Sequence, residues 1–114
     1  MLLQIHEIEA LLQVKRNIER SISNPITIRS LLRGTGFSES KLTQGFKFLF
    51  QYTVHRYHLT ISMEYAYSLL ADDMPVKEVA LKLGYKSQSH FNRSFRQVFG
   101  IAPSHIRRDI DAVE

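Results

Sequence analysis

The sequence of 114 residues predicts an all-α fold of seven helices, in which two helix-turn-helix units are joined by a long helix. Apolar residues recur at helical spacing, and no segment alternates with a period of two for long enough to indicate a sheet. Helix-start and helix-stop residues follow one another at short intervals. In addition, an internal repeat divides the chain into two similar halves.

The first half is expected to hold three helices. The first runs over about residues 4–22 and ends before Asn24-Pro25, because proline disfavours helical geometry in the preceding residue. A short helix follows, capped by Thr27 and stopping at Gly36, and Ser38 caps a third that runs to about Phe50. The apolar stripe of the first helix consists of Ile5, Ile8, Leu11, Leu12 and Ile18.

The second half is expected to begin with the joining helix, roughly Val54 to Ala71, which Asp72-Asp73-Met74-Pro75 breaks. Another short helix then ends at Gly84, Ser87 caps the next helix, and Pro103 opens the last one.

The internal repeat gives each half the same order of elements: a short helix, a turn with glycine, and a longer helix with apolar residues four apart. This order is the helix-turn-helix pattern, and glycine suits the turn because a left-handed residue is needed where the first helix ends. Eight residues of the first half have an equivalent in the second half: the first five of them 48 positions later, and the last three 49 positions later. The equivalent pairs are Ile28/Val76, Leu31/Val79, Leu32/Ala80, Gly36/Gly84, Phe37/Tyr85, Leu42/Phe91, Phe46/Phe95 and Phe50/Phe99.

The charge distribution favours an anionic partner. The formal net charge is +4, and the segments between Glu39 and Glu64 and between Glu78 and Asp109 contain no acidic residue. A merely solvated helix usually mixes Glu with Lys, so these segments indicate contact with nucleic acid. The chain has no cysteine, which excludes disulfides and thiolate metal sites. We expect no membrane segment and no secretory signal.

The candidate site residues lie on the second helix of each repeat, opposite the apolar stripe. Amides, hydroxyls and cations suit base edges, and Lys or Arg near helix ends suits phosphates. In the first repeat they are Ser40, Thr43, Gln44 and Lys47. In the second repeat they are Gln88, Ser89, His90, Asn92, Arg93 and Arg96.

The length of the joining helix fits two DNA-binding units that contact the same duplex. Its 18 residues would span about 27 Å, and recognition helices about 34 Å apart enter successive major-groove segments. We expect a rod of this length, plus the offset of each unit, to provide that separation.

Other chemistries fit the sequence less well. His55 and His58 are one turn apart and could bind a metal ion, but no third ligand is obvious. Asp72-Asp73 is read as an inter-helix turn rather than a catalytic pair. We expect no catalytic residue, no cofactor and no enzymatic activity. The alternative function is a helical protein-interaction module that contacts RNA polymerase or another protein without reading DNA.

Over about residues 8–108 the chain resembles the C-terminal DNA-binding domain of AraC-type transcription regulators. In the second half the resemblance rests on Val76-Lys77-Glu78-Val79-Ala80, Gly84-Tyr85, Phe91, Arg93, Phe95-Arg96, Gly100, Pro103 and Arg107. In the first half it rests on Gly36-Phe37-Ser38, Leu42, Phe46-Lys47, Tyr57, Met63 and Ala66. Within the family, residues 41–47 are most similar to the branch of siderophore-responsive regulators related to the pyochelin regulator.

The resemblance implies a bacterial transcription regulator, usually an activator, whose two homeodomain-like units bind double-stranded promoter DNA. Base contacts would fall on Ser40, Thr43 and Gln44, and on Gln88, Ser89, His90 and Arg93, with Lys47 and Arg96 on phosphates. The expected divisions are a first unit at 5–52, a linker helix at 53–71 and a second unit at 72–110. The partners would include RNA polymerase, and the location would be the cytoplasm, on the nucleoid when bound. A small-molecule effector would act on an N-terminal sensor domain of the parent protein, absent from residues 1–114.

Departures from the family pattern concentrate in the first unit. Leu32 stands where alanine is usual, Gln51 where glycine is frequent and Ser62 where arginine is common. Gly45 inside the predicted recognition helix should cost about 1 kcal/mol relative to alanine. We therefore expect the second unit to be the stronger base reader.

Overall fold

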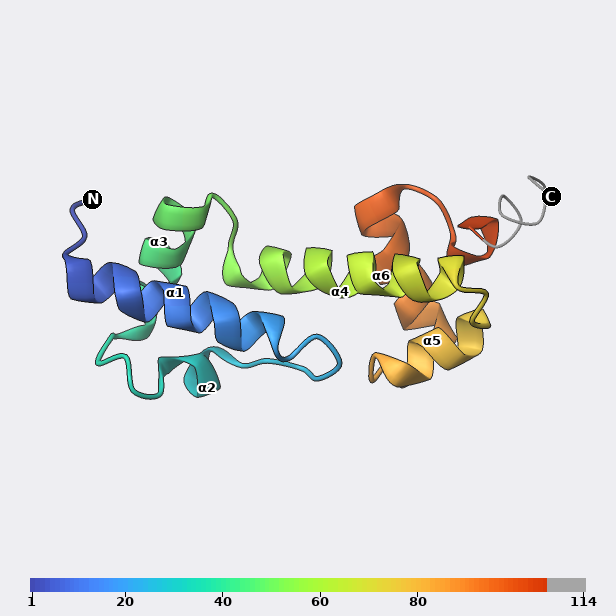
Figure 1. Cartoon of the computed structure of the whole chain (residues 1–114), viewed down its shortest axis with the longest axis horizontal. Helices are drawn as coiled ribbons and strands as arrows, with labels where there is room; N and C mark the ends of the chain where they lie inside the picture. Colours follow the sequence, from blue (N-terminus) through green and yellow to red (C-terminus); the bar gives the residue numbers. More distant parts are fainter. Residues whose placement is uncertain (107–114) are drawn as a thin grey trace. The chain divides into compact units, whose positions relative to one another are not determined.

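The computed structural model describes residues 1–106, and its regular structure in this range is entirely helical. Residues 103–106 begin a further helix at Pro103, as predicted, and its continuation lies outside the described residues. The all-α prediction is therefore confirmed. The six complete helices are α1 (Ile5–Glu19), α2 (Ile28–Leu32), α3 (Glu39–Phe50), α4 (Val54–Ala71), α5 (Val76–Lys82) and α6 (Gln88–Phe99) (Figure 1).

Three helices begin at the predicted capping residues. The Thr27 hydroxyl accepts a hydrogen bond from the Ser30 N–H at 3.1 Å. Ser38 and Ser87 do the same for the third N–H of α3 and α6, at 3.1 and 3.2 Å. Each cap satisfies one of the amide groups that a helix N-terminus leaves without an intrahelical partner.

The first helix is shorter than predicted, because it ends at Glu19 rather than near residue 22. The Ser21 hydroxyl donates to the Asn17 carbonyl at 3.0 Å, and the Ser21 N–H bonds to Ile18 instead of continuing the helical ladder. The apolar pattern continues to Ile18, so periodicity alone does not reveal that this serine competes for the last carbonyls.

The second helix also ends early, at Leu32 rather than near Gly36. Gly34 has φ +75° and Gly36 has φ +71°, so the turn holds two left-handed residues. In the second repeat Lys82 stands in place of Gly34, and α5 includes it as its last residue, so that the left-handed glycine of this turn is Gly84, at φ +83°. A single glycine therefore shortens the first helix of the first repeat by one half-turn.

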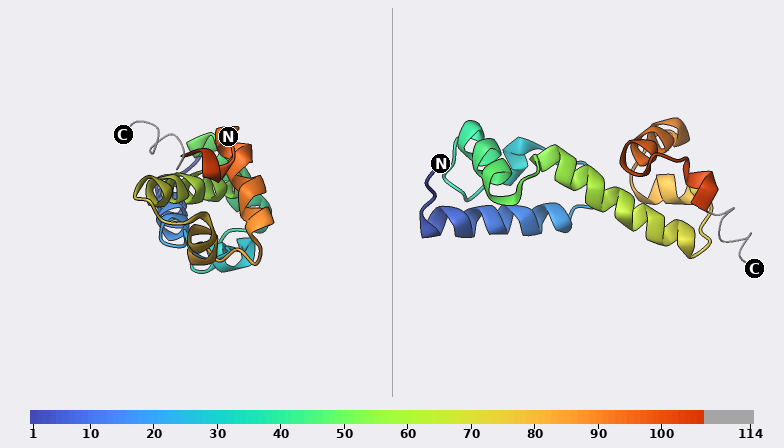
Figure 2. Two further views of the ribbon diagram at one scale, coloured as in Figure 1. Left: turned by 90° about the vertical axis from the view of Figure 1, so that its right-hand side faces the viewer. Right: turned by 90° about the horizontal axis from the view of Figure 1, so that it is seen from above.

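The described residues form two compact units, residues 1–58 and the residues from 59 onward, and α4 contributes to both. In the first unit α1 packs on α2 and α3, and α2 packs on α3 (Figure 2). Its core is formed by Leu11, Val14, Ile18, Leu31, Leu42, Phe46 and Val54. Ile5 and Leu12, predicted to belong to the apolar stripe of α1, are exposed, because the buried stripe runs through Val14 instead.

In the second unit α5 packs on α6, and α4 supplies the remaining wall. The ring of Tyr67 on α4 lies 5.3 Å from that of Phe99 on α6. The core consists of Met63, Ala66, Leu70, Val79, Ala80, Leu83, Phe91, Phe95, Pro103 and Ile106. Because Phe91 and Phe95 are fully buried, they determine which stripe of α6 faces outward.

Gly45 allows α3 to approach α1 closely. A Cβ at this position would lie 3.2 Å from Cδ1 of Leu11, a side chain that is itself fully buried. The structure thus gives a packing reason for a residue that weakens the helix by about 1 kcal/mol in propensity.

The break after α4 has the geometry of a helix C-cap. The Met74 N–H bonds to Leu69 O and the Asp73 N–H to Leu70 O, while Asp73 takes φ +70°. These paired bonds form a Schellman motif, and aspartate tolerates the left-handed region better than most residues. Asp72-Asp73 is therefore part of an inter-helix turn, as predicted. No helix in the described residues is long and apolar enough to cross a membrane.

Candidate nucleic-acid interface

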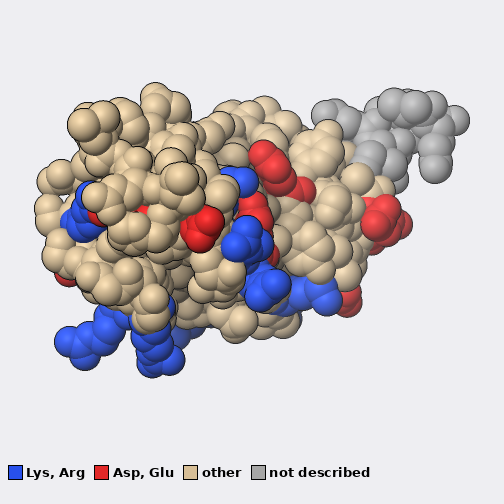
Figure 3. Space-filling view, turned by 60° about the vertical axis from the view of Figure 1, so that its left-hand side comes forward, with Lys and Arg blue, Asp and Glu red and all other residues tan. Residues whose placement is uncertain are grey.

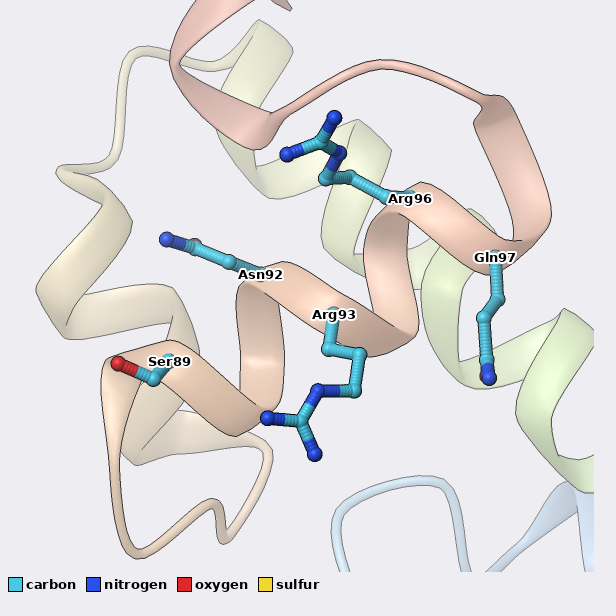
Figure 4. A pocket seen from close by; sticks show the side chains of 5 residues that line it. All are labelled: Ser89, Asn92, Arg93, Arg96 and Gln97. Carbon is cyan, nitrogen blue, oxygen red and sulfur yellow. The ribbon is translucent and has the colours of Figure 1, made fainter.

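The outer stripe of α6 forms an open hollow lined by cations and amides. Its volume is about 570 Å³, and Figure 4 shows the five side chains that surround it. Four of them were predicted from the pattern, of which Ser89, Arg93 and Arg96 follow one another at helical spacing. Asn92 is the fourth predicted residue, and Gln97, which was not predicted, completes the lining.

The two arginines of α6 are available for an anionic ligand. Arg93 and Arg96 are exposed, and neither forms a hydrogen bond or ion pair within residues 1–106. No carboxylate occurs on α6 itself. Guanidinium groups in this condition can bind guanine edges or phosphate oxygens in a bidentate manner.

Asn92 was expected on the outward face of its helix, but its side chain is less exposed than that position implies. Its side chain is half-buried, and Oδ1 has neither solvent contact nor a hydrogen-bond partner in the described structure. Figure 4 shows the amide nitrogen at the tip of the side chain. Asn92 therefore offers mainly a donor to the hollow, not the donor–acceptor pair that bidentate adenine recognition requires.

Gln88 and His90 lie in the first turn of α6 and are exposed, but they do not line the hollow. The backbone N–H of His90 is bound to the capping Ser87 hydroxyl. The structure thus brings four of the six predicted residues of this helix together and leaves these two at its N-terminal end.

On α3 the predicted residues are also on the outer face, but they bond with one another. The Gln44 amide donates to the Ser40 hydroxyl at 3.0 Å. The Thr43 hydroxyl donates to the carbonyls of Glu39 and Ser40 at 3.1 and 3.2 Å. Lys47 is exposed. The hydrogen-bonding groups of this face are therefore partly used within the helix, unlike those of α6.

An ion pair connects α3 to α1 beside this face. Lys41 Nζ lies 2.9 Å from a carboxylate oxygen of Glu7. The Gln4 backbone N–H, donating at 2.8 Å, and then Lys41 hold the pKa of Glu7 below its ordinary value of 4.5. Lys41 is consequently neutralised in part within the protein, and Lys47 is the more available cation of α3.

A second carboxylate stabilises the other end of α1. The Tyr57 hydroxyl donates to Glu19, and Lys15 lies 3.3 Å from the same carboxylate. The Tyr57 hydrogen bond, with Lys15, holds the pKa of Glu19 below 4.5. His58 contacts the Ser21 carbonyl through Nε2 at 3.0 Å. These contacts fix the start of α4 to the first unit.

Sequence reasoning missed two sets of residues. Gln97 lies one turn beyond Arg93, a position that helical spacing could have identified. Arg29 on α2 and Arg33 just after it are exposed, and the segment from Arg20 to Ser38 holds no carboxylate. At the lower left of the face in Figure 3, basic side chains project with no acidic side chain between them.

Within residues 1–106, no three His, Cys, Asp or Glu side chains lie close enough to hold a metal ion. The candidate site therefore consists of two helices with polar and cationic outer faces, and the described residues reveal no metal site beside it.

Comparison with known proteins agrees with this arrangement. A sequence family described as "Helix-turn-helix domain" matches residues 31–109. The chain is 30% identical over 94 residues to the regulatory protein SoxS of Escherichia coli K12, covering 79% of this chain and 85% of that protein. A crystal structure of a probable AraC family transcriptional regulator from Rhodopseudomonas palustris superposes with a TM-score of 0.77 at 30% identity, over 90% of this chain and 97% of that one.

The chain belongs to the AraC family of helix-turn-helix domains. It is a sequence-specific DNA-binding domain of a transcription regulator. The C-terminal domain of AraT, a response regulator from Geobacillus stearothermophilus, shares the fold with a TM-score of 0.81 at 24% identity, over 88% of this chain and 84% of that one. The narrower resemblance to the pyochelin-regulator branch remains a prediction.

Other relatives are longer than this chain. It covers 36% of the probable transcriptional regulator LumQ of Photobacterium leiognathi, at 30% identity over 88 residues and 76% of this chain. It covers 29% of the transcriptional regulator CdhR of Pseudomonas aeruginosa, at 31% identity over 98 residues and 85% of this chain.

Proposed function

We propose that this AraC-type domain activates transcription by placing α3 and α6 in two successive major-groove segments of promoter DNA. The observation that carries the proposal is the outer stripe of α6, where Arg93 and Arg96 line an open hollow and are exposed. Groups of this kind recognise guanine and phosphate.

The predicted site residues divide into base-reading and phosphate-binding groups. Arg93, with Ser89, Gln88 and His90, would read bases, and Arg96 would bind the backbone. On α3, Gln44, Ser40 and Thr43 would read bases once their bonds with one another exchange for bonds to DNA. Lys47 would bind a phosphate.

Arg29 and Arg33 extend the proposed contact to α2 and the turn after it. The first helix of a helix-turn-helix unit crosses the DNA backbone. The equivalent positions in the second unit are Lys77 and the exposed, apolar Leu81. We therefore place more of the sequence-independent phosphate contact in the first unit.

The activating role, the contact with RNA polymerase and the cytoplasmic location belong to the same proposal. Support comes from the similarity to SoxS, named a regulatory protein, and from the DNA-binding family itself. We also propose that an effector acts on a sensor domain of the parent regulator, since the chain covers only 36% and 29% of LumQ and CdhR.

The test is binding of the purified chain to duplexes enriched from a randomised library, measured across a salt series. Neutralised phosphates release counterions, so the logarithm of the binding constant should fall with log[salt] with a slope of about −0.9 per contact. Arg29→Ala with Arg33→Ala should make the slope shallower by about 2 and weaken all sequences alike.

The matched control removes two cations at the end of α1, as Arg16→Ala with Arg20→Ala, and should change the slope much less. A slope near zero for the unaltered chain, or equal competition by unrelated DNA together with tight polymerase binding, would instead support a protein-interaction module.

A further inference from the structure

Phe48 is an exposed aromatic side chain on the polar face of α3. Its side chain is 48% exposed, although burying it would be worth more than burying most other residues. It lies four residues after Gln44 and eight after Ser40, so the three share one stripe of the helix. The neighbouring phenylalanines point the other way: Phe46 is fully buried and packs on Phe50 at 4.7 Å.

The internal repeat shows what this position does in the other unit. With the offset of 49 residues that relates Phe46 to Phe95, Phe48 corresponds to Gln97. Gln97 lines the hollow of α6 beside Arg93 and Arg96. The same position on α3 therefore carries an apolar ring where α6 carries an amide.

The surroundings of Phe48 restrict what it can bind. Gln44, four residues before it, and Gln51, three residues after it, are exposed and polar, and so is the adjacent Lys47. The next exposed aromatic residue, Tyr52, lies beyond the end of α3 and packs beside Tyr57. A protein-docking site generally needs a contiguous apolar patch, and a single ring among hydrogen-bonding groups does not provide one. The major-groove edge of DNA has the matching pattern, since the thymine 5-methyl is an apolar group among hydrogen-bond acceptors and donors.

We propose that Phe48 contacts the 5-methyl group of a thymine in the major-groove segment that α3 enters, next to the base read by Gln44. This inference rests on the proposed function and adds a residue that determines sequence preference. The first unit would then prefer thymine at one position of the binding site, in addition to its phosphate contacts.

The experiment uses the whole chain and duplexes enriched from a randomised library. Each thymine of the enriched site is replaced in turn by uracil, which removes only the methyl group. For the unaltered chain, one or two replacements in the segment assigned to α3 should weaken binding about fourfold, the equivalent of one methyl left unburied. Phe48→Ala and Phe48→Gln should bind thymine and uracil equally at that position, while sensitivity at other positions is retained.

Tyr52→Ala is the matched control, because Tyr52 is 47% exposed but follows the end of α3 and packs beside Tyr57 at 6.1 Å. It should leave the uracil profile unchanged. The inference is overturned if Phe48→Ala weakens binding but keeps the thymine-to-uracil difference, or if no such difference occurs in the unaltered chain. Absence of any enriched duplex would instead remove the proposed function. Unchanged circular dichroism and melting temperature confirm that the variants fold.

Discussion

The C-terminal ends of α3 and α6 are capped by different residue types. Gln51 at the end of α3 has φ +68°, and Gly100 at the end of α6 has φ +75°. A side chain in this left-handed region is strained by about 1–2 kcal/mol, whereas glycine is not. The end of α3 therefore contains local strain that the end of α6 avoids.

Gln51→Gly should stabilise the protein by about 0.5–1 kcal/mol, because the relief of strain outweighs the greater freedom of glycine in the unfolded chain. The variant also loses an exposed hydrogen bond from Gln51 Nε2 to the Phe48 carbonyl. Urea denaturation measures the change.

Gly100→Ala is the reverse substitution and should destabilise by about 1 kcal/mol. An added Cβ there meets nothing within 4 Å, so its cost is purely conformational. Destabilisation by Gln51→Gly would show that the side-chain hydrogen bond matters more than the backbone geometry.

The ionised carboxylate of Glu7, which accepts from the Gln4 N–H and pairs with Lys41, makes stability depend on pH. Because these two contacts hold the folded pKa of Glu7 below 4.5, they stabilise the fold at pH values above the unfolded pKa. This contribution is lost as pH falls through the folded pKa. The difference in unfolding free energy between the native protein and Glu7→Gln should thus be greatest near neutral pH and shrink below about pH 4.5.

Denaturation midpoints at a series of pH values test this expectation. Glu9→Gln, which removes an exposed carboxylate of the same helix without touching Lys41, is the control. A difference that grows toward acidic pH would contradict the assignment of the pair.

At the scale of elements, α3 and α6 are prepared differently for binding. On α3, Gln44 and Ser40 are bonded to each other, whereas Arg93 and Arg96 of α6 are exposed. Binding by α3 must exchange internal hydrogen bonds for external ones, which leaves little net gain per bond. This difference supports α6 as the stronger reader.

Arg93→Ala should therefore weaken binding to the enriched site by about 1–3 kcal/mol and relax preference at one or two base pairs. Arg96→Ala should weaken all sequences alike. Competition with duplexes altered one base pair at a time distinguishes the two effects. A uniform loss for Arg93→Ala would reassign this residue to the DNA backbone.

Much of each element could be predicted, because its signals are local. The caps Thr27, Ser38 and Ser87 and the bounds of α4 follow from side-chain chemistry and proline. The early end of α2 depends on Gly34, one of two glycines in the same turn, and sequence alone does not say which one ends the helix.

The sequence predicts which face of each helix a site residue occupies. It does not predict how deeply the side chain is buried or which hydrogen bonds it forms within the protein. Arg93, Arg96 and Gln44 are outward as expected, since the phenylalanines opposite them are buried. The half-buried setting of Asn92 and the bonds within α3 arise from packing and from rotamers. Spacing carries no information about either.

At the scale of the whole molecule, α4 is the connection on which a two-segment reading depends. Thr60→Pro should break α4 near its middle, since proline removes a backbone donor and clashes with the preceding turn. Duplexes in which two enriched segments are separated by varied numbers of base pairs measure the effect. The unaltered chain should prefer one spacing and Thr60→Pro should tolerate several, with Thr60→Ala as control. A spacing preference that survives in Thr60→Pro would show that α4 does not set the separation.

The sharing of α4 between two cores also has a calorimetric consequence. Val54 belongs to the core of the first unit, and Met63, Ala66 and Leu70 belong to that of the second. Loss of either core would leave half of one continuous helix without packing, and short isolated helices are marginal in water. Heat should therefore unfold both units in one transition, with calorimetric and van't Hoff enthalpies equal, although each unit has a hydrophobic core of its own.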